Sequence, residues 1–274
     1  MKHVTRRITA KPDSLDMGLA ELWAHRELLI WFGWRDLTVR YRQTAAGVLW
    51  AFLQPVAMMA LFSITLGYLA RVPSDDLPYA VLVLTGIVPW TLIGSTLGST
   101  SSSLVANSAL MTKVYFPRSV MVFSAALTPF VDFLIALVVL AVMMMLYGIV
   151  PKPTALLLPF LGLAIVLTAL GPGLWLATLN VRFRDVRFII PFLLQIGLFG
   201  SPVVYPISLV PPTLWNIYIL NPAVFPIEAF RYLLLGTGTL TPAMFVTWFV
   251  FVAVSIPTGL LFLRAEERLF ADAI

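Results

Sequence analysis

The stretch WFGWRDLTVRYRQ, from Trp31 to Gln43, leads into the first long apolar segment of the chain, which begins near Gly47. This stretch carries four charged side chains and four aromatic rings. It is too charged to enter a bilayer and too aromatic for an ordinary solvated tail. Aromatic and basic side chains together are typical of the membrane–water interface. The sequence therefore predicts a segment that lies along a membrane surface and is joined directly to the first membrane span.

The composition of the whole chain supports a membrane protein. Of 274 residues, 60% are hydrophobic and 11% are charged, whereas soluble domains carry about 25% charged residues. The absence of cysteine excludes disulfides and thiol chemistry. No apolar signal region follows the basic residues 1–12, so we expect no cleavable signal peptide.

Six apolar stretches approach the roughly 20 residues that a spanning helix needs. They are residues 48–69, 79–97, 120–147, 155–179, 188–205 and 243–263. We therefore expect an all-α polytopic membrane protein with a transmembrane domain at residues 47–264. Residues 1–46 form a cytoplasmic segment with an amphipathic interface helix, because Leu15, Leu19, Leu22, Trp23 and Ile30 recur at helical spacing. Gly33 is expected to bend the chain before a second short helix at 34–44, and 265–274 is a cytoplasmic tail.

The basic residues predict the orientation. Fifteen Lys and Arg side chains fall in the segments on one side of the expected spans, and three, Arg71, Lys152 and Arg231, fall on the other. The positive-inside rule places the fifteen in the cytoplasm, with both termini. Attraction to anionic membrane lipids is the simpler role for this charge, and nothing in the pattern favours nucleic-acid binding.

The region between the last two spans is irregular. Pro and Gly interrupt the fifth stretch, Pro211 and Pro212 can open a short helix that Asn221 and Pro222 end, and a second runs from Pro226 to a cap at Gly236. Both are too short to span a membrane and are apolar, so we expect them to dip into it from outside. Irregular backbone at membrane depth is tolerated where it is buried in protein or lines a cavity. This predicts a pathway with an outer gate at Pro211, Pro212, Asn221 and Pro222.

Several kinds of chemistry lack the residues they need. No Gly-Lys pair occurs, so the chain has no Walker A loop and is not expected to hydrolyse ATP by itself. No cluster of His, Asp or Glu has metal-ligand spacing. Asp75 and Asp76 could serve as the acid pair of a membrane enzyme acting on polyprenyl-phosphate sugars, although adjacent acids in such a loop more commonly keep it solvated.

Asp132 is the sole acid well inside a predicted span. Such residues indicate a functional site by default. No basic residue lies within another span to pair with it. Two interpretations remain open: a polar contact in a channel or helix interface, and an acid satisfied near the headgroups by Ser or Thr hydroxyls.

Four stretches resemble permease subunits of ABC-2 type polysaccharide exporters, which export O-antigen, capsule or teichoic-acid chains. They are RDLTVRYRQTAAGVLWAFLQP (35–55), NSALMTKVYFPRS (107–119), NVRFRDVRFIIPFLLQ (180–195), and SPVVYPISLVPPTLW with LNPAVFPIEAFR (201–215 and 220–231). The resemblance is collinear from about residue 34 to the C-terminus. It implies a homodimer around a channel in a bacterial inner membrane, two separate ATPase subunits that use ATP and Mg, and a lipid-linked glycan as cargo. This chain would itself bind no cofactor.

The resemblance also implies roles for individual residues. The expected ATPase-coupling residues are Lys113, Tyr115, Phe116, Arg118, Arg35, Asp36, Tyr41, Arg42, Arg184 and Asp185. The expected glycan-lining residues are Trp50, Phe52, Trp90, Asp132, Phe199, Tyr205 and Trp215. The alternatives are anchoring of the basic residues on lipid phosphates and of the aromatic residues at the bilayer interface. Rival functions are an ABC-2 permease for another lipid or drug, the membrane enzyme above, and a secondary transporter. A secondary transporter would be expected to have paired broken spans in two internal repeats.

Overall fold

The computed structural model describes residues 17–42, 47–75, 77–111, 113, 116–183 and 185–267, with the backbone alone for residues 47–51. Throughout these ranges the regular structure is helical and no strand occurs. The prediction of an all-α protein is therefore confirmed for the part of the chain that the structure describes.

Five helical stretches are long and apolar enough to cross a membrane. They are α3 (Gly47–Phe62) with its π-helical continuation η1 (Ser63–Leu69), α4 (Tyr79–Ala106), α6 (Arg118–Ser124) with α7 (Leu127–Leu146), η2 (Pro153–Leu157) with α8 (Leu158–Arg182), and α12 (Pro242–Glu266). These five correspond to five of the six predicted spans.

The remaining predicted span, residues 188–205, is only partly helical. Helix α9 (Val186–Phe199) has 14 residues, which at 1.5 Å per residue is about 21 Å, shorter than the roughly 30 Å of hydrocarbon core. The sequence predicts that Pro and Gly residues break this span, and the structure places the break after Phe199, while α9 runs on through Pro191 and Gly197. Turns follow instead, because Gly200, Pro202 and Pro206 do not sustain a helix.

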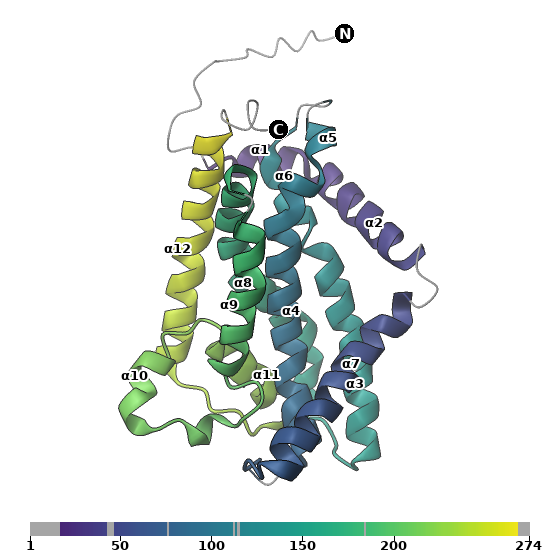
Figure 1. The fold of residues 1–274 in the computed structure, drawn as a ribbon, viewed down its shortest axis with the longest axis vertical. Coiled ribbons are helices and arrows are strands. Elements are labelled where there is room, and N and C mark those ends of the chain that lie inside the picture. The colour runs from purple at the N-terminus through teal and green to yellow at the C-terminus, as the bar shows by residue number, and fades with distance from the viewer. Residues whose placement is uncertain are drawn as a thin grey trace.

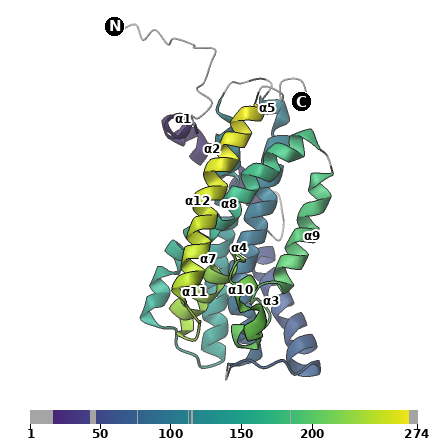
Figure 2. The same cartoon turned by 90° about the vertical axis from the view of Figure 1, so that its left-hand side faces the viewer.

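Helix α4 is the centre of the bundle. It packs along α8, which in turn packs on α12, while α7 and α3 cover its other sides (Figure 1). Small residues allow the close α4–α8 contact: a Cβ at Gly173 would lie 2.1 Å from the Thr100 hydroxyl. The turned view of Figure 2 shows α12 and α8 side by side along the length of the bundle.

The last turns of α4 carry the Ser and Thr cluster at 99–103. Helix α4 continues to Ala106, past the predicted end at residue 97. The hydroxyls of Thr100, Ser102 and Ser103 donate to carbonyls three or four residues earlier in the same helix, at 2.6, 2.8 and 2.7 Å. This bonding explains how a polar sequence continues an apolar helix.

The bundle has two distinct ends. One, which we call the α1 end, carries α1 (Leu19–Ala24), α5 (Ser108–Met111) and α6 at the top of Figure 1. The opposite α10 end carries α10 (Trp215–Tyr218), α11 (Val224–Leu235) and the connection from η1 to α4. Hydrogen bonds hold the α10-end loops together: Lys152 N–H donates to Leu234 O at 2.9 Å. Arg71, Lys152 and Arg231 all belong to this end, whereas Lys113, Arg118, Arg182 and Arg264 lie in the elements and connections of the α1 end.

Helix α2 (Arg26–Arg42) runs from the α1 end down beside α6 and α7 (Figure 1). The predicted bend at Gly33 is wrong, because α2 is continuous there and the break between α1 and α2 lies at His25. Gly33 instead permits close packing, since a Cβ would lie 2.2 Å from Leu127 Cδ1. Trp31 and Trp34 are 63% and 70% exposed, while Phe32 between them is buried.

The α10 end contains the short elements expected from its prolines. The 3₁₀ turns η3 (Ile207–Leu209) and η4 (Pro212–Leu214) precede α10, and α11 ends at Gly236, whose φ of 77° is the left-handed cap that favours glycine. Helix α11 begins at Val224, two residues before Pro226. Its entry into a membrane stays a prediction.

Candidate functional site: a polar cavity joined to the α1 end

A cavity of about 420 Å³ lies among α3, α4, α7 and α9. Its polar lining comes from Arg40, Gln54, Thr91, Ser95, Asp132 and Gln195, and its apolar lining includes Pro55, Met58, Trp90, Phe133 and Leu194. Trp90 and Asp132, both predicted to line a pathway, are therefore brought to the same cavity. The sequence had not indicated Gln54 and Gln195 for this site, although an amide in an apolar span was a visible signal.

The two glutamine amides favour a polar role for this cavity. Gln54 lies in α3 and Gln195 in α9, both among apolar residues. A polar group in hydrocarbon without a hydrogen-bond partner costs several kcal/mol, about 2–7 by transfer measurements. Amides, a carboxylate and a flat indole ring in one cavity offer donors, acceptors and an apolar face. Such a surface suits a hydroxyl-rich ligand.

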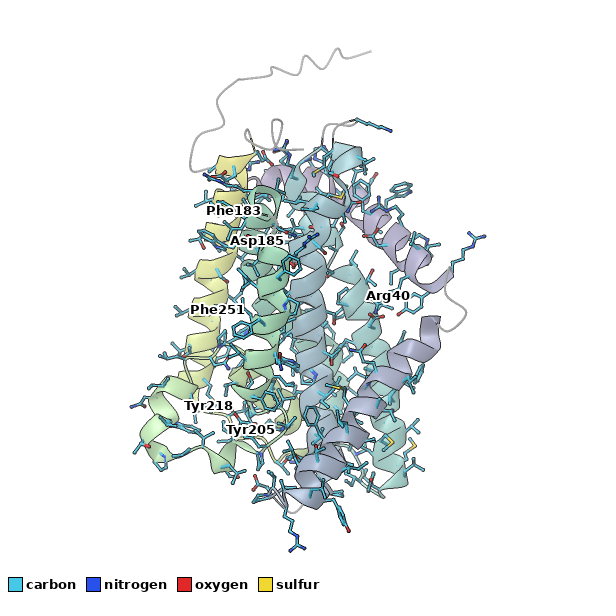
Figure 3. All side chains as sticks on the ribbon, in the orientation of Figure 1. Arg40, Phe183, Asp185, Tyr205, Tyr218 and Phe251 are labelled. Atoms are coloured by element: carbon cyan, nitrogen blue, oxygen red, sulfur yellow. The ribbon has the colours of Figure 1, made fainter. Side chains whose placement is uncertain are left out.

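Asp132 is held by two adjacent residues at the end of α2. The Tyr41 hydroxyl donates to Oδ1, and the Arg40 guanidinium lies 2.8 Å from Oδ2. Figure 3 shows the Arg40 side chain between the end of α2 and α7. Of the two interpretations left open for Asp132, satisfaction by Ser or Thr hydroxyls is wrong, because a phenol and a guanidinium bind its two oxygens. The partners come from the interface segment and not from another span, which is why comparing spans did not find them.

Burial raises the pKa of the Tyr41 phenol, and its bond to the Asp132 carboxylate raises it further. Tyr41 therefore remains protonated and acts as the donor. Tyr41 had been assigned to ATPase coupling alone; the structure places its hydroxyl on Asp132, and a contact with an ATPase stays a prediction.

Nearer the middle of α2, Phe32 and Arg35 contact the connection between α4 and α6. The Phe32 and Phe116 rings lie 5.4 Å apart, and Arg35 Nη2 donates to Asn107 Oδ1 at 2.7 Å. Arg35 also forms an ion pair with Asp36 at 2.7 Å. Two predicted coupling residues, Arg35 and Phe116, thus take part in joining α2 to the connection between α4 and α6.

Phe116 is only 6% exposed and packs in an apolar cluster with Leu104, Val120 and Met121. Its ring stabilises the segment from inside in this conformation, so an outward contact of Phe116 has no support from the structure. Lys113 is exposed and is the better candidate for meeting a partner.

The remaining predicted coupling residues are dispersed. Arg118 Nη1 donates to the backbone carbonyl of Glu267, while Arg42 and Asp185 are exposed. Figure 3 shows Asp185 beside Phe183 near the start of α9. Tyr115 and Arg184 lie outside the described residues.

Ion pairs fix the α1 end. Arg264 at the end of α12 pairs with Glu21 of α1 at 2.7 Å, and Arg182 pairs with Glu266 at 3.7 Å. Burial raises the pKa of the neighbouring Glu267 carboxyl, although Arg118 and Arg264 act to lower it.

The aromatic residues predicted to line the pathway do not form one surface. The Tyr218 hydroxyl donates to that of Tyr205 at 3.2 Å, which donates to Phe199 O at 2.8 Å (Figure 3). Phe199 is 54% exposed at a second, shallower cavity of about 430 Å³ with Phe192, Gln195 and Ile196. Trp215 packs instead on the cluster of Ile207, Val224 and Met244, Phe52 is half-buried, and the Trp50 side chain lies outside the description. For these residues contact with a glycan stays a prediction.

An ion pair that the sequence reading missed anchors the α10 end. Arg231 Nη1 lies 2.8 Å from Glu228 Oε1, and the two side chains are 3% and 2% exposed. Arg231 Nη2 also donates to Val203 O at 3.2 Å, and Glu228 Oε2 accepts from Thr239 N–H at 2.8 Å. The charge count treated Arg231 as a loop residue; acid and base three residues apart in apolar α11 were the available signal.

The predicted outer gate is hydrogen-bonded to the turns that follow α9. The Asn221 amide donates to Gly200 O at 3.0 Å and to Ser201 Oγ at 2.9 Å. Pro211 and Pro212 are exposed and Pro222 is half-buried. The role of this segment as an outer gate stays a prediction.

The acidic loop of the rival enzyme shows no metal site. Exposed Asp75 accepts a bond from the Ser208 hydroxyl at 2.9 Å, and Asp76 lies outside the described residues. Within the described ranges no group of three or more His, Cys, Asp or Glu could hold a metal ion. In the structure Asp75 joins two α10-end loops.

Comparison with known proteins agrees with this architecture. The family model of the ABC-2 type transporter matches residues 27–235. The O-antigen export system permease protein RfbA of Myxococcus xanthus is 33% identical over 188 residues, which cover 69% of this chain and 72% of the relative. An RfbA of Klebsiella pneumoniae is 28% identical over 217 residues, covering 78% and 82%. The polysialic acid transport protein KpsM of Escherichia coli is 22% identical over 236 residues, covering 85% and 91%. The chain belongs to the ABC-2 type transporter family.

Proposed function

We propose that this chain is the membrane-spanning subunit of an ATP-driven exporter of a lipid-linked polysaccharide. The relatives named for O-antigen export and polysialic acid transport support this cargo class. The observation that carries the proposal is the cavity beside Asp132, where two amides, a carboxylate and the Trp90 indole line the space between spans.

The proposal assigns a place in the membrane to each part of the chain. The α1 end faces the cytoplasm, because most of the basic residues belong to it. Helix α9 and the turns after it complete a sixth crossing, and the short elements up to α11 dip into the outer leaflet. The exposed Trp31 and Trp34 of α2 lie at the lipid interface.

The proposal also requires partners. Two copies of this chain form the channel, and two separate ATPase chains bind ATP and Mg at the α1 end, where Lys113 is exposed. This chain itself needs no cofactor and acts as a transport subunit.

Complementation tests the function. The chain is expressed with its neighbouring ATPase in cells that make the lipid-linked glycan but lack their own permease. We expect glycan at the cell surface, whereas accumulation inside the cell despite a stable complex would contradict the proposal. ATPase stimulation by another lipid or by a drug, without glycan export, would instead favour the alternative cargo.

Cavity variants test the site. Gln54→Ala with Gln195→Ala removes both amides and should lower export about thirtyfold, because each lost contact to a bound sugar weakens binding by about 1 kcal/mol. Val138→Ala on the exposed, apolar side of α7 is the matched control. Equal export by both variants would exclude this cavity from the glycan path.

A further inference from the structure

We infer that Asp132 is the point at which α2 is fastened to the cavity wall, so that displacement of the connection between α4 and α6, which α2 contacts at Asn107 and Phe116, reaches α7 through α2. Asp132 is then a positioning residue that couples ATP-driven movement to the cavity. The inference rests on the proposed function and concerns how the glycan site is driven.

The first step is the contact between α2 and the segment that a partner would push. Phe32 packs on buried Phe116 with ring centroids 5.4 Å apart, and Arg35 donates to Asn107 at 2.7 Å. One contact is apolar and the other is a charge-assisted hydrogen bond, so they resist both separation and sliding. Movement of the segment must therefore carry this part of α2 with it.

The second step is transmission along α2. The helix has 17 residues without proline, and the part from Phe32 to Tyr41 extends over about 14 Å at 1.5 Å per residue. Gly33 lies against the Leu127 side chain at the start of α7. A continuous helix in close contact along one side moves as a unit, because bending it would break its backbone hydrogen bonds.

The third step is the fastening at Asp132. Arg40 and Tyr41 engage the two oxygens of one carboxylate from consecutive positions of α2. Asp132 and Arg40 both line the cavity, so the same contact joins the helices and forms part of the wall. A carboxylate within an apolar span is costly, and this pairing gives it a role that a neutral residue cannot fill.

A second explanation for Asp132 is direct contact with the ligand in the cavity. The two explanations differ in one respect. If Asp132 fastens α2 to α7, a different mechanical link between the two helices can replace it. If Asp132 contacts the ligand, such a link cannot restore the lost contact.

The chain offers a suitable link because it has no native cysteine. A Cβ at Gly33 would lie 3.1 Å from Leu127 Cβ, close to the roughly 3.8 Å typical of disulfides. In Gly33→Cys with Leu127→Cys, the leucine methyl group that would clash is also removed. Oxidation of this pair fixes α2 to α7 about two turns away from Asp132.

The experiment uses the complex with its ATPase in membrane vesicles and compares Asp132→Asn with and without the cysteine pair. Asp132→Asn should lower export about tenfold, within the usual range of coupling effects, while ATP hydrolysis continues. Oxidation of the pair in the Asp132→Asn background should restore most of the export, and reduction should abolish it again. The pair in the otherwise unchanged chain should export equally in both redox states.

Two results would overturn the inference: unchanged export by Asp132→Asn, or lost export that the disulfide does not restore. If Asp132→Asn fails to assemble, Arg40→Gln with Tyr41→Phe removes the fastening from α2 without altering the span, and the same rescue is expected.

A cargo-independent measurement separates this inference from the proposed function. ATP should leave the rate of disulfide formation unchanged in the parent pair and change it in the Asp132→Asn pair. If the unchanged chain exports no glycan but this difference holds, the cargo assignment fails and the fastening stands. Equal responses to ATP in the two pairs would reject the fastening.

Discussion

The Glu228–Arg231 pair shows how much a single buried charge contributes at the α10 end. Because both side chains are almost fully buried, removal of one partner leaves an uncompensated charge and should cost about 3–5 kcal/mol. We expect Glu228→Gln and Arg231→Met each to lower the melting temperature of the purified protein strongly. The double variant should be less destabilised than the sum of the two, as thermal unfolding in detergent can show. Strict additivity would mean that the two charges do not interact.

Glu267 makes a pH-dependent contribution at the α1 end. Its pKa is raised above the ordinary value of 4.5, chiefly by burial, so the folded protein binds a proton more tightly than the unfolded chain. The contribution to stability is therefore fully present below pH 4.5 and is lost as the pH rises through the higher folded pKa. Glu267→Gln should be less sensitive to pH over this window and more stable at pH 7. Parallel unfolding curves for both proteins at every pH would contradict this.

At the scale of elements, close packing by glycine positions the turns after α9. A Cβ at Gly86 of α4 would lie 2.1 Å from the Val203 carbonyl oxygen, whereas one at Gly98 of the same helix meets nothing within 4 Å. Gly86→Ala should therefore destabilise the protein by about 1–3 kcal/mol through overpacking. Gly98→Ala, the matched control, should be neutral or stabilising by up to about 1 kcal/mol through helix propensity. The same outcome for both would show that the turns adapt freely.

Elements with strong local signals were predictable from the sequence. Five spans and the Gly236 cap follow from apolar length and glycine chemistry. The course of α2 past Gly33 did not follow, because tertiary contact decides it, whereas the turns after α9 follow from the glycine and prolines at 200, 202 and 206. Gly33 indicates a bend when read alone, and only the neighbouring Leu127 explains its place within a straight helix.

At the scale of the whole molecule, the charge distribution predicts orientation. The cysteine-free background allows single labels at opposite ends: Lys113→Cys at the α1 end and Thr213→Cys at the α10 end, both at exposed positions. A membrane-impermeant thiol reagent added to cells with a permeabilised outer envelope should label Thr213→Cys alone. Inverted vesicles should give the opposite result. Labelling of Lys113→Cys from outside would reverse the proposed orientation.

Only part of the candidate site could be predicted from the sequence. Asp132 was recognisable as an acid within a span, and Trp90 as an aromatic residue in the preceding span. Arg40 and Tyr41 approach Asp132 from 91 or more positions away in the chain, and a contact between such distant segments depends on how the helices pack. The buried pair in α11 was missed for a related reason, since burial there comes from α4 and the turns after α9.

The hydrogen-bonded hydroxyls in the last turns of α4 bear on biosynthesis. Thr100, Ser102 and Ser103 satisfy their hydroxyls within α4 and need no neighbouring helix to do so. Helix α8, which later packs against Thr100, is synthesised more than 50 residues afterwards. Helix α4 can therefore enter the lipid as it leaves the ribosome and wait there for α8, without exposing unpaired hydroxyl donors at these three positions.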